Sequence, residues 1–301
     1  LLMLLEEIEK LIKEKFGSLN EVQRLAIPKI LERKNVIISS PTGSGKTEAA
    51  LIPIFNELLK NKISIFCLYV TPLRALNRDL LSRLDWWANK LDIEIAVRHS
   101  DTSLYERRKQ SIFVPNILIT TPETLNIILV AKKLREYLKN LNFVVIDEIH
   151  ELLDSKRATQ LAFCIKRLKL ISNNITFIAL SATIANKDEI RKIFGEKFEF
   201  VSTFERKKYE IDVILEEDLK KRVEKILDVI RNNRLTIIFT NTREQAEALA
   251  NRLKEFENVE VHHSSLSKEI REKVESLMRE GKIKACVATS SLQLGIDTVS
   301  Y

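Results

Sequence analysis

The stretch "VIISSPTGSGKTEAALIP", residues Val36 to Pro53, decides the fold of this chain. An apolar run breaks into a loop of small and polar residues, and the chain then resumes with residues that favour a helix. In a phosphate-binding P-loop, successive backbone N–H groups and a helix N-terminus surround phosphate oxygens. Ser40 stands where the usual pattern begins with glycine, and a small residue suits that position. The stretch therefore predicts a P-loop between a strand and a helix.

Each residue type of this loop has a separate role in binding a nucleotide. The two glycines permit unusual backbone angles and a close approach of the main chain to phosphate. The lysine reaches the terminal phosphates, and the hydroxyl after it holds Mg²⁺. A flexible Gly/Ser loop is the alternative, but it rarely places Gly-Lys-Thr where a strand changes to a helix. The candidate nucleotide-binding residues of the loop are Thr42, Gly43, Ser44, Gly45, Lys46 and Thr47.

A second stretch, "FVVIDEIHE" from Phe143, contains the carboxylates that nucleotide hydrolysis needs. Asp147 ends an apolar run and can hold Mg²⁺ through its water shell, together with Thr47. Glu148 can orient and deprotonate the attacking water. The alternative is an acidic helix start after a strand, which is common on its own. We take Lys46, Asp147 and Glu148 as the candidate catalytic residues.

Short apolar runs alternate with helical patterns along the chain. The runs are rich in Ile, Val and Phe and carry little polar alternation, which is typical of strands buried on both faces of a parallel sheet. We therefore expect an α/β fold with helices on both faces of the sheet. The runs of the first part begin at Asn35, Ile63, Ile93, Asn116, Asn142 and Ile175.

A polar and basic segment, "STFERKKYE" from Ser202 to Glu210, predicts a linker. Further strand candidates follow at Ile211, Leu235, Val259 and Ile283. The expected domains are therefore residues 1–203 and 204–301, and the second lobe, with four strands and no closing helix, looks incomplete.

Composition narrows the class of protein. With 49 basic and 42 acidic residues among 301, the net charge of +7 permits a nucleic-acid partner without demanding one. The three cysteines stand far apart and form no CxxC pair, so we expect neither a zinc site nor a disulfide framework. The opening "LLMLL" is far shorter than the ~20 residues that span a bilayer. We expect a cytoplasmic protein without a membrane segment.

Seven motifs then stand in a familiar order: "SPTGSGKT", "TPLRAL", "TTPET", "DEIH", "SAT", "FTNTR" and "ATSSLQLGID". Their order and spacing resemble those of superfamily 2 helicases, in which Ala or Ser commonly opens the P-loop. More narrowly, "VRHSDTSLYERR" and "HHSSLSKEIREKVE" resemble the large helicase-related (Lhr) type, although Ser100 stands where that pattern has glycine. The resemblance implies two RecA-like lobes, ATP and Mg²⁺ as cofactors, and nucleic acid as the partner.

The resemblance also implies roles for single residues. Gln23 would read the adenine edge, and Gly295 and Asp297 would close on the nucleotide from the second lobe. Ser181 and Thr183 would couple the nucleotide site to strand movement. His150 either links the two lobes or is a satisfied buried histidine. The implied nucleic-acid contacts are Thr71, Pro72, Arg74, Thr121, Pro122, Thr240, Asn241, Arg243, Ser264 and Thr289.

Several alternatives stay open at this point. The resemblance implies a Gln…Gly-Arg…Gly-Arg element that lends arginine fingers after Asp297. The chain ends at Tyr301 first, so we expect a fragment of a larger enzyme. The function is either a processive helicase, an ATP-controlled nucleic-acid clamp, or a DEAD-box-like local RNA remodeller. DNA is favoured over RNA, but the residues themselves do not choose, and 3′-to-5′ movement is implied only by the resemblance. Trp86 and Trp87 either stack on bases or belong to a core.

Overall fold

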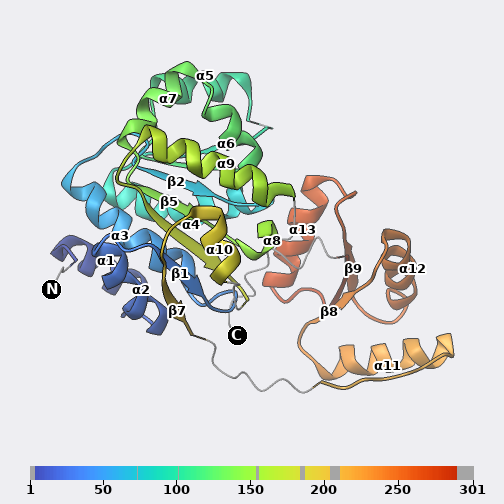
Figure 1. Ribbon diagram of the computed structural model, residues 1–301. Coiled ribbons are helices and arrows are strands. Elements are labelled where there is room, and N and C mark those ends of the chain that lie inside the picture. The colour runs from blue at the N-terminus through green and yellow to red at the C-terminus, as the bar shows by residue number, and fades with distance from the viewer. Residues whose placement is uncertain are drawn as a thin grey trace. The chain divides into compact units, whose positions relative to one another are not determined.

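The computed structural model describes residues 4–72, 74–100, 102–153, 156–183, 187–203 and 211–289, without the side chains of 74–79, 82, 187, 268, 272 and 279. The chain divides into two compact units, Leu1–Glu205 and Arg206–Tyr301, which are described separately below (Figure 1).

The first unit is built on a parallel sheet of seven strands in the order β3-β4-β2-β5-β6-β1-β7. This confirms the predicted α/β class, and six of the strands match predicted runs. The seventh, β7, was not predicted, because its sequence "EFVS" is short, begins with Glu and lies at the sheet edge. The strands are β1 (Val36–Ser39), β2 (Cys67–Val70), β3 (Ile95–Arg98), β4 (Ile117–Thr120), β5 (Phe143–Ile146), β6 (Thr176–Ser181) and β7 (Glu199–Ser202).

Helices cover both faces of this sheet because successive strand residues point to opposite sides. In β2, Tyr69 packs into one apolar cluster and Leu68 into the other. The first cluster is closed by α1 (Glu6–Phe16), α2 (Glu21–Leu31), α3 (Lys46–Lys60) and α4 (Arg74–Leu91). The second is closed by α6 (Pro122–Ile128), α7 (Lys132–Tyr137), the 3₁₀ turn Leu138–Asn140, α8 (His150–Leu153), α9 (Lys156–Ile171) and α10 (Lys187–Phe194).

The adjacent tryptophans of α4 belong to the first of these cores. Trp87 is fully buried, and its ring stacks on Phe55 with centroids 5.2 Å apart. Trp86 is partly buried, with the ammonium group of Lys15 4.6 Å from its ring centroid. The interpretation as core and rim is confirmed, and base stacking by these rings is not needed to explain them.

The second unit holds a parallel sheet in the order β8-β10-β9, where β8 is Thr236–Phe239, β9 is Val259–His262 and β10 is Ala285–Ala288. The helices α11 (Leu219–Asn232) and α12 (Arg243–Leu253) share one apolar cluster with this sheet. The helix α13 (Lys268–Arg279) lies over the other face. This arrangement again confirms a parallel α/β architecture.

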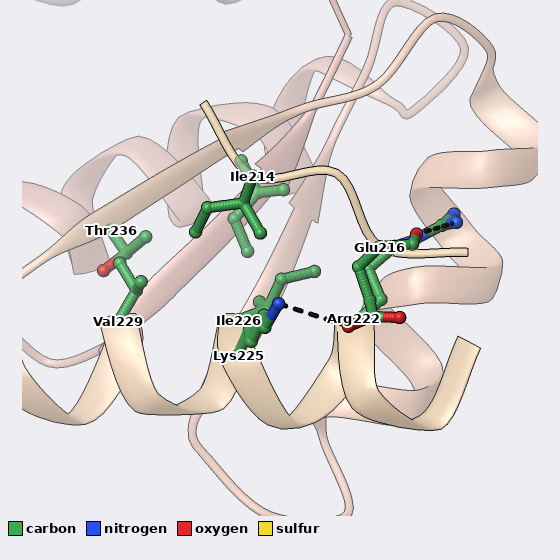
Figure 2. A pocket seen from close by; sticks show the side chains of 8 residues that line it. Ile214, Glu216, Arg222, Lys225, Ile226, Val229 and Thr236 are labelled. Carbon is green, nitrogen blue, oxygen red and sulfur yellow. Dashed lines mark hydrogen bonds and ion pairs between the residues drawn. The ribbon is translucent and has the colours of Figure 1, made fainter. Parts of the chain in front are cut away.

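The strand predicted at Ile211 is wrong. Residues 211–218 belong to no helix or strand, and Ile211, Val213 and Leu215 are 81–91% exposed. Within the described residues, the sheet consists of β8, β10 and β9, and this segment does not pair with the open edge of β8. Ile214 instead lines a cavity of about 260 Å³ together with Val229 of α11 and residues of β8 (Figure 2). Apolar content alone does not make a strand, because backbone N–H and C=O groups need a partner.

Within the described residues, no helix has the length and apolar content required to cross a bilayer.

Candidate functional site

The candidate residues of the first unit gather at one edge of its sheet. In a parallel sheet all strands end at the same edge, where open α/β folds bind their ligands. The P-loop follows β1, Thr71 follows β2 and Thr121 follows β4. Asp147 and Thr183 come after β5 and β6. The topology therefore brings together residues that lie far apart in the sequence.

The P-loop forms the predicted strand-to-helix turn. Gly43 and Gly45 have φ angles of 76° and 81°, in the left-handed region that favours glycine, and Gly45 caps the start of α3. The ammonium group of Lys46 donates hydrogen bonds to the carbonyl oxygens of Ser40 (2.6 Å) and Pro41 (2.8 Å). The loop thus curls around the charged group that is expected to meet phosphate.

The start of α2 is attached to this loop. Asn20 and Gln23 form a capping box, in which each side chain accepts a hydrogen bond from the other's backbone N–H. The Asn20 amide also donates to the carbonyl of Ser44 (2.9 Å), and the Gln23 amide donates to that of Gly45 (3.5 Å). Gln23, the predicted adenine reader, therefore lies directly against the P-loop and is 3% exposed.

Ser40, which replaces the usual first glycine, is fully buried. Its backbone N–H donates to the carbonyl of Ser181 (3.1 Å), and its hydroxyl lies 2.9 Å from that of Thr203. The replacement therefore adds a side-chain link from the P-loop to the end of β7. No signal in the sequence pointed to Thr203, because β7 itself was not predicted.

A tyrosine joins the two predicted Mg²⁺ ligands. The phenol of Tyr69 donates to Oδ2 of Asp147 (2.6 Å), and the side chain of Thr47 lies close enough to oppose the rise that burial causes in the pKa of this phenol. The backbone N–H of Glu148 donates to Oδ1 of Asp147 (2.9 Å). Burial raises the pKa of Asp147, whereas these hydrogen bonds and the charge of Lys46 oppose the rise. Sequence analysis missed Tyr69, because a tyrosine within "CLYV" is typical of a core strand.

Glu148 has the features of a general base. Burial, followed by the charge of Asp147, raises the pKa of its carboxyl group to about 7. Its Oε2 atom is buried and accepts no hydrogen bond from the described residues. Its φ of 43° is in the left-handed region, which is strained for a residue with a side chain. Such strain and pKa shifts are frequent at catalytic positions.

The predicted coupling residues form one chain of contacts. Nδ1 of His150 lies 3.2 Å from the hydroxyl of Ser181 and 3.4 Å from Oε2 of Glu148. The Ser181 hydroxyl accepts a hydrogen bond from the N–H of Thr183 (3.3 Å). Burial lowers the pKa of His150. The network therefore connects the candidate base to the loop after β6, within the first unit.

The nucleic-acid candidates of the first unit lie after the neighbouring strands β2 and β4. Thr71 is fully buried, and its N–H donates to the carbonyl of Thr120 (2.9 Å). Thr121 is 3% exposed, and its hydroxyl caps α6, which Pro122 begins. The carbonyl of Pro72 accepts a hydrogen bond from an arginine of α9, while the side chain of Arg74 lies outside the described part. The hydroxyl of Thr121 and the backbone N–H of Thr71 thus have structural partners already.

The candidates of the second unit gather after its three strands. The guanidinium group of Arg243 donates to the hydroxyl of Ser264 (3.2 Å). The N–H of Thr240 donates to the carbonyl of Ala288 (2.8 Å), next to Thr289. Asn241 is exposed, whereas Gly295 and Asp297 lie outside the described residues and remain predictions.

The paired histidines of the second unit have protein partners. Nε2 of His262 lies 2.9 Å from Glu275, and Nε2 of His263 lies 3.0 Å from Glu247. No group of three His, Cys, Asp or Glu residues is arranged to hold a metal ion in the described ranges. A magnesium site of one carboxylate and one hydroxyl, completed by water and phosphate oxygens, does not require such a group.

Comparisons with known proteins agree with this geometry. Residues 20–191 match the family model for DEAD/DEAH box helicases, and residues 219–300 match that of the helicase conserved C-terminal domain. The ATP-dependent helicase Lhr-Core protein 2 of Thermococcus barophilus is 38% identical over 98% of this chain and 39% of its own length. The ATP-dependent helicase Lhr-Core of Methanocaldococcus jannaschii is 40% identical over 97% of this chain, and again 39% of its own length is covered.

A solved helicase structure is also similar to this chain. Mycobacterium smegmatis helicase Lhr bound to ssDNA and AMP-PNP superimposes with a TM-score of 0.83, at 30% identity, over 98% of this chain and 42% of that chain. The chain thus spans about two fifths of the length of the relatives it matches. The α/β units described above have the RecA-like architecture of helicase motors.

Proposed function

Because the chain belongs to the DEAD/DEAH box helicase family, we propose that it is the motor part of an Lhr-Core-type ATP-dependent helicase. It hydrolyses ATP at the carboxyl edge of the first sheet and uses the reaction to move along, or unwind, nucleic acid. The first unit carries the hydrolytic residues. The residues after β2 and β4, and those after the three strands of the second unit, bind the nucleic-acid backbone without reading its sequence.

One observation carries the ATPase part of this proposal. The phenol of Tyr69 donates a hydrogen bond to the carboxylate of Asp147 and lies beside the side chain of Thr47, so the two side chains are close together. A hydroxyl and a carboxylate are oxygen donors of the kind that Mg²⁺ prefers, so the residues present fit this ion. When bound, Mg²⁺ would neutralise charge on the terminal phosphates. Thr47 and Asp147 would hold it, the latter through water.

The other residues of the site have roles that follow from their contacts. Lys46 meets the terminal phosphates, exchanging its bonds to the loop carbonyls for bonds to phosphate oxygens. Glu148 accepts a proton from the attacking water, since its Oε2 is buried, accepts no hydrogen bond from the described residues and belongs to a carboxyl group with a pKa of about 7. Gln23 reads adenine from its position against Gly45. His150 and Ser181 transmit the state of Glu148 to Thr183.

DNA is the substrate that we test first, because the Mycobacterium smegmatis relative is described as bound to ssDNA and AMP-PNP. The measurement is ATP hydrolysis by this chain with no nucleic acid, with single-stranded DNA and with RNA of the same length. We expect turnover that nucleic acid stimulates. ATP binding and strand binding without any turnover, by this chain and by a version extended past Tyr301, would contradict the motor proposal and favour an ATP-controlled clamp.

Two variants separate binding from chemistry. Lys46→Ala should abolish nucleotide binding, whereas Glu148→Gln should keep it and lower turnover by about 10²–10⁴-fold, as expected for a lost general base. Lys60→Ala, at the exposed end of the same helix α3, is the matched control. Normal hydrolysis by Lys46→Ala would overturn the assignment of the P-loop.

A duplex with a single-stranded tail then tests movement. A processive motor should displace the strand only when the tail has one polarity, and we expect that to be the 3′ tail. Equal displacement with either tail, confined to short duplexes, would indicate a local remodeller instead.

A further inference from the structure

Two arginines lie together at the start of α5 (Leu104–Ile112), the helix that follows β3. The guanidinium group of Arg98, the last residue of β3, donates to the carbonyl of Arg107 (3.5 Å). That of Arg107 donates to the carbonyls of Ser100 (2.8 Å) and His99 (3.2 Å). These bonds hold the two side chains against the turn that leaves the carboxyl edge of the sheet.

Neither arginine is neutralised by the part of the chain that the structure describes. All of their described partners are carbonyl oxygens, and no Asp or Glu of the described ranges forms an ion pair with them. Nε of Arg107 is buried and donates to no described acceptor. Both side chains are half-buried, and burial together with the charge of Arg107 lowers the pKa of Arg98. Two like charges without counterions in a partly desolvated place are unfavourable unless an anion binds.

Polar contacts position α5, rather than hydrophobic packing. The helix has no buried residue. Its Gln110 amide donates to the carbonyl of Val97 (2.9 Å), and β3 is an edge strand whose other side pairs with β4. The side chains of α5 thus cover the open edge of the sheet, and they place the arginine pair where β3 ends.

This place adjoins the candidate nucleic-acid contacts. The hydroxyl of Thr120, at the end of β4, donates to the carbonyl of Arg98 (2.8 Å). The next residue, Thr121, is a candidate contact, and Thr71 follows the adjacent strand β2. The arginine pair therefore extends this row by one strand, toward the sheet edge.

We propose that Arg98 and Arg107 together bind one phosphate group of a single-stranded nucleic acid that runs across the carboxyl edge of the first sheet. Guanidinium groups suit this role because their planar donors match phosphate oxygens and their charge is permanent. The inference rests on the proposed function, because it takes the strand to pass over Thr71 and Thr121.

The test measures the affinity of this chain for a fluorescent oligothymidylate over a series of salt concentrations. Arg98→Gln should raise Kd by about ten-fold and reduce the slope of log K against log salt by about 0.7, the value for one phosphate contact on a single strand. Arg98→Lys keeps the charge but loses the planar guanidinium group that can donate two parallel hydrogen bonds to one phosphate. Its Kd should therefore rise, while the slope of log K against log salt stays the same.

Arg108→Gln is the matched control, because this exposed neighbour on the same helix loses the same charge. It should change Kd and slope less than Arg98→Gln does. Equal effects of the two substitutions would overturn the inference and leave the proposed function intact. No oligonucleotide binding by the unaltered chain would overturn the inference and the proposed nucleic-acid binding, whereas ATP hydrolysis tests the motor proposal separately.

Unfolding of a variant and binding of another polyanion are the two remaining outcomes of this test. Thermal unfolding of each variant shows whether a loss of binding reflects a loss of fold. If Arg98→Gln unfolds, Arg98→Lys still decides, since a Kd and slope both equal to those of the parent would contradict a forked phosphate contact. Unchanged oligothymidylate binding with loss of binding to polyglutamate would assign the pair to an acidic polypeptide and overturn the inference.

Discussion

The phenol of Tyr69 donates a 2.6 Å hydrogen bond to Oδ2 of Asp147, the residue that follows the neighbouring strand β5. The same phenol lies beside the side chain of Thr47 on α3, so one aromatic side chain adjoins both proposed Mg²⁺ ligands. Partners of this kind orient the groups that contact a metal, and their loss is typically felt in metal affinity.

Tyr69→Phe should therefore raise the Mg²⁺ concentration needed for half-maximal ATP hydrolysis by about 10–100-fold, the range typical of such partners. The fold should persist because the ring stays in the core. A titration of activity with Mg²⁺ measures the effect. Tyr137→Phe, which removes a hydroxyl from a partly buried tyrosine of α7, is the control. An unchanged Mg²⁺ requirement would show that the phenol does not position the ligands.

Glu148 should make the folded state less stable as the pH rises. Its pKa is raised from 4.5 to about 7, so the folded chain binds more protons than the unfolded chain between these values. The free energy of unfolding therefore falls as pH rises through this window, and the loss is complete above pH 7. Glu148→Gln removes the charge, and it should be more stable than the parent by about 1–3 kcal/mol at alkaline pH.

Denaturant unfolding at several pH values, without nucleotide and with a chelator, checks this. The advantage of Glu148→Gln should vanish below the unfolded-state pKa, because the parent carboxyl group is then neutral in both states. The difference between the two curves isolates this group, since all others titrate in both proteins. A difference independent of pH would exclude the carboxyl charge as its cause.

Gly45 should tolerate alanine less well than another glycine of similar backbone geometry. At Gly45 (φ +81°) a Cβ would lie 2.7 Å from the amide nitrogens of Asn20 and Gln23, whereas at Gly17 (φ +76°) it would meet no atom within 4 Å. Gly17→Ala should cost about 1 kcal/mol for the backbone strain alone. Gly45→Ala should cost about 1–2 kcal/mol more, because both amides must move and release their hydrogen bonds.

Thermal or denaturant unfolding of the two variants measures this difference, and nucleotide titration follows the site itself. We expect Gly45→Ala to lose nucleotide affinity as well, since Gln23 and the loop backbone move together. Equal stability of the two variants would mean that α2 and the P-loop are not coupled through these amides.

Arg243 of the second unit should contribute to nucleic-acid binding through its charge. Its guanidinium group is exposed and lies 3.2 Å from the hydroxyl of Ser264. Arg243→Gln should weaken oligonucleotide binding uniformly across sequences and lower the salt dependence, as a phosphate contact predicts. Arg252→Gln, in the last turn of the same helix α12, is the control and should have a smaller effect. Equal behaviour of the two variants would contradict a specific role for Arg243.

Local features of both units could be predicted from the sequence because they depend on neighbouring residues. The P-loop is an example, since Gly43 and Gly45 adopt the left-handed angles that such a turn requires. Buried strands followed by helices are another, and the apolar runs at Asn35, Asn116 and Asn142 all contain strands. The strand predicted for the apolar run at Ile211 is wrong for a physical reason. A strand needs hydrogen bonds to a neighbouring strand, and no local pattern reveals whether these form.

The sequence by itself determined which chemical groups this protein has, in which order, and on which kind of element. Tertiary structure alone decided which of them meet. Tyr69 reaches Asp147 because β2 and β5 are neighbours in the sheet, and Ser40 reaches Thr203 because β7 pairs with β1. The raised pKa of Glu148 likewise arises from burial. Such contacts join residues distant in the chain, so strand order and burial fix them rather than any spacing along the sequence.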